Sequence, residues 1–160
     1  MKEIKKQLCI LEKDEQELSP DELELLKAAK EATFRSYSAY SHFSVGAALR
    51  LDNGQIVTGS NQENCAYPSG LCAERTAVFY ANANYPDNAI THLCIAARDT
   101  KGEFTPLPVA PCGACRQVLV ESEHRYSHPI QIMLYGTEGS YFINSAEDLL
   151  PVSFDASFLE

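Results

Sequence analysis

Two short cysteine motifs carry the clearest chemical signal in the sequence. Cys-Ala-Glu occupies residues 72–74, and Pro-Cys-Gly-Ala-Cys occupies residues 111–115. Each motif opens a segment with helical periodicity, where unpaired backbone N–H groups stabilise a thiolate, the form of cysteine that binds metals. Cys112 and Cys115 are three residues apart, so on a helix both sulfurs lie on one face and can hold one ion. Together with Cys72 they predict a zinc site with three thiolate ligands.

Glu74 indicates what such a metal is used for. A structural zinc site closes with four protein ligands, whereas a catalytic site keeps one position for water. Zinc lowers the pKa of that water from about 16 to near 7, which makes a nucleophile available at neutral pH. Side chains lean towards the N-terminus of a helix, so we expect Glu74, in the same turn as Cys72, to reach this position. A carboxylate there can shuttle protons, and Glu74 is the candidate catalytic residue.

Two other interpretations of the cysteines remain open. Cys112 and Cys115 could form a redox pair, which would leave Cys72 and Glu74 unexplained. A closed structural zinc site would need a fourth ligand, and Cys65, seven residues before Cys72, is the obvious candidate. The open-site interpretation therefore requires that Cys65 stays off the metal.

The composition narrows the class of partner. The 160 residues are 45% hydrophobic and 22% charged, as in one globular domain. The formal net charge is −9, and a nucleic-acid partner is not expected because a protein that grips phosphates needs a basic surface. No stretch approaches the roughly 18 apolar residues of a membrane span, and no secretory signal is visible. We expect a cytoplasmic protein, with reduced cysteines, that binds a small molecule and no membrane.

The elements that must position these motifs alternate between helix and strand. Ser19, Pro20 and Glu22 form a capping box with a proline start. Residues 136–139 are too few for the crossover of about a dozen residues that parallel strands need, so the last two strands are expected to be antiparallel. Helices are expected over 19 to about 37, 72 to about 83, 112–123 and a short span after 145, and strands over 45–51, 55–60, 90–97, 130–135 and 141–143. This order predicts an α/β fold of three layers, α-β-α, with a five-stranded mixed sheet.

The first eighteen residues stand apart from this pattern. Residues 1–18 are heavily charged, and we interpret them as an N-terminal extension to a domain that spans residues 19–160. Cys9 and Cys94 lie in short apolar runs, so both are expected to be buried thiols that act as small hydrophobic side chains.

The two cysteine motifs resemble the signature of zinc deaminases, which combines a His-x-Glu and a Pro-Cys-x-x-Cys element. The form present here, Cys-Ala-Glu-Arg with Pro-Cys-Gly-Ala-Cys-Arg-Gln, is similar to the small, homotetrameric, three-cysteine cytidine deaminases. The resemblance covers about residues 19–154. It implies a cytidine-deaminase-like fold that holds Zn²⁺, and a hydrolase of pyrimidine salvage that deaminates cytidine and deoxycytidine. A deaminase of another small aminopyrimidine nucleoside, or a non-enzymatic zinc-stabilised binding module, is the alternative.

Three further segments resemble substrate-binding elements of that family. Tyr-Ser-His-Phe resembles the segment whose phenylalanine stacks on the pyrimidine, which implies that role for Phe43. Asn-Gln-Glu is similar to an element that holds the ribose hydroxyls, here Asn61 and Glu63. The segment that ends at Phe154 resembles one that lends an aromatic ring to a neighbouring subunit's site, which implies a homotetramer with sites at subunit interfaces. A packed Phe43, and an Asn61/Glu63 pair that only serves a strand end, are the structural alternatives.

Two arginines follow the cysteine motifs. Three thiolates on Zn²⁺ leave a net charge of −1, which would weaken the ion as a Lewis acid. An arginine that donates hydrogen bonds to sulfur would offset this charge. We expect this of Arg75 and Arg116, and an ordinary ion pair is the alternative for each.

Overall fold

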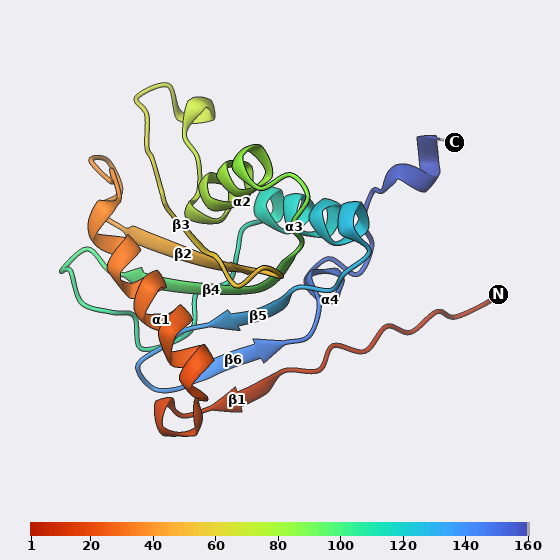
Figure 1. Cartoon of the computed structure of the whole chain (residues 1–160), viewed down its shortest axis with the longest axis horizontal. Helices are drawn as coiled ribbons and strands as arrows, with labels where there is room; N and C mark the ends of the chain where they lie inside the picture. The colour runs from red at the N-terminus through yellow and green to blue at the C-terminus, as the bar shows by residue number, and fades with distance from the viewer. Residues whose placement is uncertain (160) are drawn as a thin grey trace.

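A mixed sheet of six strands forms the middle layer of the computed structural model, which describes residues 1–159 (Figure 1). The strand order is β1-β6-β5-β4-β2-β3. β4 and β5 run parallel, and every other neighbouring pair is antiparallel, including β5 and β6 as their short connection predicts. The strands are β1 (Leu11–Lys13), β2 (Ser44–Leu51), β3 (Ile56–Ser60), β4 (Ile90–Arg98), β5 (Gln131–Leu134) and β6 (Ser140–Ile143).

The expected number of five strands is wrong because β1 lies within the segment interpreted as an extension. Leu11 pairs with Phe142 of β6, and Leu18 is buried. Lys13 bonds the Glu22 carboxylate at 2.8 Å and lies over the Phe142 ring. β1 has only three residues, all exposed or half-buried, which are too few to show an alternating pattern in the sequence. Its pairing with β6 is what makes it a strand. The domain boundary at residue 18 stays a prediction.

Helices cover both faces of the sheet, which confirms the three-layer α/β fold. α1 (Pro20–Ala32) packs on one face, and α2 (Ala73–Asn84), α3 (Gly113–Tyr126) and the short α4 (Ala146–Leu149) pack on the other. Each face has its own buried cluster, because the strands alternate their apolar side chains between the two layers. Within residues 1–159, no helix has the length and the apolar character needed to cross a membrane.

The caps predicted for α1 are present, but the helix is shorter than expected. Ser19 accepts a hydrogen bond from the Glu22 backbone N–H, and the Glu22 carboxylate accepts one from the Ser19 N–H. The helix ends at Ala32, and a 3-10 turn follows over Thr33–Arg35. The Lys30 carbonyl accepts both the Thr33 N–H and, at 2.7 Å, the Thr33 hydroxyl, so bonds to the residue three positions back replace the helical pattern here.

Two features of the fold bring the starts of α2 and α3 to the same end of the sheet, where β4 has its carboxyl end. α3 connects the parallel strands β4 and β5, so it runs back across the sheet and begins beyond the carboxyl end of β4. α2 approaches β3 closely at Gly59, where a Cβ atom would lie 2.5 Å from the Ala73 carbonyl oxygen and the Ala77 nitrogen. Glycine at this position therefore seats the first turns of α2 directly on the sheet.

A buried carboxylate joins α3 to the elements that follow it. Glu123 is 5% exposed. It accepts hydrogen bonds from the backbone N–H groups of Ile130 at 2.6 Å and Ala146 at 2.8 Å, from the Glu147 N–H at 3.3 Å, and from the Ser145 hydroxyl at 2.8 Å. One side chain thus organises the end of α3, the approach to β5 and the start of α4.

Replacing Glu123 with alanine should lower the free energy of unfolding by about 4 kcal/mol, because two buried N–H groups lose their acceptor. Urea denaturation followed by circular dichroism measures the change. The matched control is Glu121→Ala, an exposed position of the same helix, which should change stability by less than about 0.5 kcal/mol. Equal effects of the two substitutions would contradict the structural role of Glu123.

Candidate metal centre and pocket

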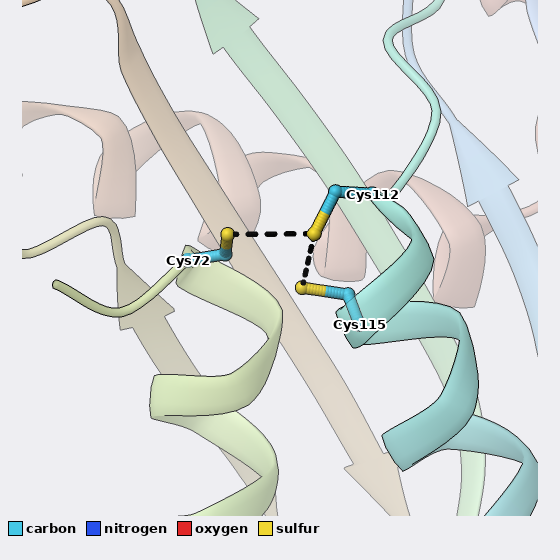
Figure 2. Close-up of side chains that lie close together, drawn as sticks. All are labelled: Cys72, Cys112 and Cys115. Carbon is cyan, nitrogen blue, oxygen red and sulfur yellow. Dashed lines mark hydrogen bonds between the residues drawn. The ribbon is translucent and has the colours of Figure 1, made fainter. Parts of the chain in front are cut away.

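Three sulfurs meet where α2 and α3 begin (Figure 2). Cys72 and Cys112 are the N-cap residues of the two helices, and Cys115 lies one turn into α3. The Cys72 and Cys112 sulfurs are 3.7 Å apart, the Cys112 and Cys115 sulfurs are 3.5 Å apart, and all three lie within 4.8 Å of one another. Sulfurs bound to one tetrahedral zinc at 2.3 Å are about 3.8 Å apart. The donor atoms therefore fit a zinc ion.

The electrostatics of the cluster favour a thiolate at Cys72. The hydrogen bond from Cys115 and that from Arg75 lower the pKa of Cys72 to about 5. The pKa of Cys115 is raised in return, because its thiol donates a hydrogen bond to the Cys72 sulfur and so keeps its proton. Arg75 Nη2 lies 3.9 Å from the Cys72 sulfur, which is the arginine–sulfur contact expected from the sequence. A bound cation would favour the deprotonated form of all three thiols.

Arg116 makes different contacts from those expected. Its Nε donates to the Pro111 carbonyl oxygen at 2.8 Å, and its Nη1 donates to the Leu149 carbonyl oxygen at 2.9 Å. Within the described part of the chain it donates no hydrogen bond to a sulfur. The structure thus gives Arg116 the task of holding the start of α3 against α4, and a contact with sulfur stays a prediction.

Glu74 lies in the first turn of α2 and is 5% exposed. Burial raises the pKa of its carboxyl group, and the negative charge of Cys72 adds to this effect, while a hydrogen bond with Cys115 opposes it. A raised pKa makes a carboxylate a better proton acceptor, which favours a role in proton transfer. The position and the electrostatics of Glu74 therefore suit a proton carrier beside the sulfur cluster.

An open pocket of about 530 Å³ adjoins the cluster, a size suited to a small molecule. Cys72, Arg75, Asn61 and Glu63 line it together, whereas Glu74 and Phe43 are not among its lining residues. The metal site and the two residues expected to bind sugar therefore share one pocket. The sequence interpretation missed several lining residues, among them Tyr40 and Tyr67, whose rings contact edge to face with centroids 6.0 Å apart, and Leu71.

In this structure Asn61 and Glu63 hold the chain segment that carries Phe43. The Asn61 side chain accepts from the Val45 N–H at 2.8 Å and donates to the Phe43 carbonyl at 2.9 Å. The Glu63 carboxylate accepts from the Tyr40 N–H at 2.8 Å and from both the N–H and the hydroxyl of Ser41. These bonds, the Ser41 hydroxyl first, lower the pKa of Glu63. Phe43 itself is half-buried.

Comparison with known proteins identifies the fold and the metal motif. A family model described as the cytidine and deoxycytidylate deaminase zinc-binding region matches residues 19–127. The chain belongs to this family. It is 37% identical to a cytidine deaminase of Halalkalibacterium halodurans over 132 residues, which cover 82% of this chain and 92% of the relative, and 38% identical to one of Sporosarcina psychrophila, covering 81% and 88%.

Solved structures agree with this assignment. The crystal structure of a cytidine deaminase from Burkholderia pseudomallei matches with a TM-score of 0.70 at 38% identity and covers 82% of this chain and 98% of that one. One from Mycobacterium tuberculosis matches with a TM-score of 0.63 at 34% identity, covering 83% and 96%. The cytidine-deaminase-like fold expected from the sequence is therefore confirmed, as is membership of a zinc-binding deaminase family.

The remaining cysteines of this deaminase-family chain lie outside the sulfur cluster. Cys65 is exposed, and its sulfur contacts the Asn64 side chain at 3.8 Å. Among residues 1–159, no other potential metal ligand joins the group of three sulfurs. The closed four-sulfur site is thus not supported. Cys94 is buried as expected, but the expectation for Cys9 is wrong: it is exposed, because residues 1–10 form no element that packs on the sheet.

Phe154 lies beyond α4 and is not among the residues that line the pocket. Its side chain is 58% exposed, and its ring stacks on Phe158 with centroids 5.6 Å apart. The Gln117 side chain donates to the Phe154 carbonyl at 2.8 Å. This contact holds the segment near α3 and leaves the aromatic ring on the surface.

Proposed function

We propose that the protein is a zinc-dependent hydrolase that converts cytidine and deoxycytidine, with water, into uridine or deoxyuridine and ammonia. The observation that carries the proposal is a group of three converging sulfurs, of which Cys72 lines an open pocket, with the buried Glu74 two residues after Cys72. The names of the relatives support the choice of substrate. Residues 19–160 would form the deaminase domain, and the reaction would belong to cytoplasmic pyrimidine salvage.

Glu74 would carry the protons of the reaction. Zinc on Cys72, Cys112 and Cys115 would supply an activated water for attack at C4 of the cytosine ring. Glu74 would take a first proton from that water and give it to N3 as the water oxygen bonds to C4. It would then take a proton from that oxygen and pass it to the amine, so that the bond from C4 to the amine breaks and ammonia leaves. Arg75 would offset the excess negative charge of the thiolates.

The substrate would occupy the pocket with its sugar towards Asn61 and Glu63. The Glu63 carboxylate has about four acceptor positions, and three of them are used by the chain. One position therefore remains for a sugar hydroxyl. Phe43 would stack on the base, since an aromatic ring offers a flat apolar partner at a low cost in conformational entropy.

The chemistry is tested by incubating the purified protein with cytidine, deoxycytidine and a panel of other aminopyrimidine nucleosides, and by following absorbance and ammonia. Turnover of the first two, abolished by a zinc chelator and restored by zinc, is expected. Turnover of a different aminopyrimidine nucleoside alone would favour the alternative deaminase, which acts on that nucleoside instead of cytidine. An inactive, zinc-loaded protein would favour a binding module instead.

Phe154 would complete the pocket of a neighbouring subunit in a homotetramer. Its exposed ring, which is not part of the lining of its own chain's pocket, supports this role. Phe154→Ala should lower kcat/KM for cytidine about tenfold, since a buried aromatic contact is lost, and should leave the zinc content unchanged. The control is Phe158→Ala, its stacked neighbour. A fully active monomer in light scattering would contradict the shared site.

A further inference from the structure

We propose that Ser41 is a positioning residue that couples the sugar side of the pocket to Phe43. The inference rests on the proposed function, because it assigns Ser41 a task only if Glu63 binds a sugar and Phe43 stacks on a base. Ser41 lines the same pocket as Asn61 and Glu63, and its hydroxyl contacts both the Glu63 carboxylate and the Phe43 N–H.

The Ser41 hydroxyl makes two hydrogen bonds whose directions are determined by their partners. The Glu63 carboxylate accepts and cannot donate when ionised, so the Ser41 proton points to Glu63 Oε1. An oxygen lone pair then remains for the Phe43 N–H, which donates to it at 3.1 Å. One group therefore orients the sugar-side carboxylate and the backbone of Phe43 at the same time.

The turn that carries Phe43 needs these bonds to persist. His42 has a φ of 55°, in the left-handed region that non-glycine residues rarely adopt. The turn lies outside helix and strand, and it is closed by a bond from the His42 N–H to the Ser38 carbonyl. Glu63 supports it from outside through the N–H groups of Tyr40 and Ser41. The Ser41 hydroxyl is the side-chain link that extends this support to Phe43.

Loss of the hydroxyl would loosen both ends of the link. Glu63 Oε1 would lose its donor, so that the carboxylate is held only through Oε2 by the N–H groups of Tyr40 and Ser41, while the Phe43 N–H would lose its acceptor. Groups dedicated to a sugar hydroxyl discriminate against analogues that lack it only while they are held in place. Ser41 should therefore govern how strongly the enzyme prefers nucleosides with sugar hydroxyls.

The test compares kcat/KM for cytidine with that for 2′,3′-dideoxycytidine, which lacks both hydroxyls. Ser41→Ala should lower the cytidine/dideoxycytidine preference about tenfold, the usual effect of one hydrogen bond to a charged group, and Ser41→Thr should restore it. The matched control is Ser38→Ala in the same turn, because the Ser38 hydroxyl contacts only Ser36 and Ser44 hydroxyls among the described residues. The control should keep the wild-type preference.

A second measurement is independent of turnover. Amide hydrogen exchange at Phe43, followed by NMR, should accelerate in Ser41→Ala and stay unchanged in Ser38→Ala. An unchanged preference in an active Ser41→Ala variant, an equal loss in the control, or unchanged exchange at Phe43 would each overturn the role of Ser41. A wild-type protein that leaves cytidine intact would instead overturn the proposed function, and the exchange data would still show whether the hydrogen-bonded link exists.

Discussion

Glu74→Gln should keep zinc and lose cytidine turnover by about a thousandfold, the typical contribution of a positioned acid–base group. Glutamine has nearly the same shape as glutamate, but it can neither give a proton to N3 nor take one from the attacking water. Burial already penalises the charged form of Glu74, so a neutral side chain at this position should not lower stability. Initial rates with cytidine and the zinc content of the dialysed protein measure the two effects.

The matched control for this substitution is Glu121→Gln, which changes an exposed glutamate on α3 and should retain wild-type activity. Turnover by Glu74→Gln within tenfold of the wild type would contradict the proton-carrying role. Loss of zinc from the same variant would contradict it in another way, because the carboxylate would then be needed to hold the metal rather than to move protons.

Cys115→Ser should release zinc and bring activity to background. The sulfur of Cys115 is buried beside the other two, and a serine hydroxyl has almost the same volume but is a far weaker zinc ligand. Two thiolates from different helices would remain, and the start of α2 would no longer be linked to the start of α3 through the metal. Zinc analysis after dialysis and thermal unfolding in the presence and absence of zinc measure the loss.

Cys65→Ser is the matched control, because it makes the same chemical change at a cysteine outside the cluster. It should retain a full equivalent of zinc and its activity. Zinc loss from Cys65→Ser comparable to that from Cys115→Ser would revive the closed four-sulfur site, which has no position for water and therefore no means to activate it.

Local signals account for the parts of the fold that the sequence predicted well. The capping box at Ser19 and Glu22 and the cysteine motifs each mark a helix start through groups only a few residues apart. The connection 136–139 determined the antiparallel pairing of β5 and β6 by its length alone. In contrast, β1 depends on pairing with β6, more than 120 residues later in the chain. No local sequence pattern therefore predicts it.

The candidate site likewise has a part that local sequence signals predict and a part that only the tertiary structure shows. The sequence by itself predicted that Cys72, Cys112 and Cys115 converge, as the structure shows, because ligand type and helical spacing are local properties that chemistry restricts tightly. The role that it predicts for Glu74 stays a proposal. Only the tertiary structure decided that Cys65 lies outside the cluster and that Arg116 bonds to backbone carbonyls. It also revealed the bonds from Glu63 through Ser41 to Phe43. Such contacts depend on how two loops meet across the pocket, and that meeting is determined by the packing of the whole sheet and its helices.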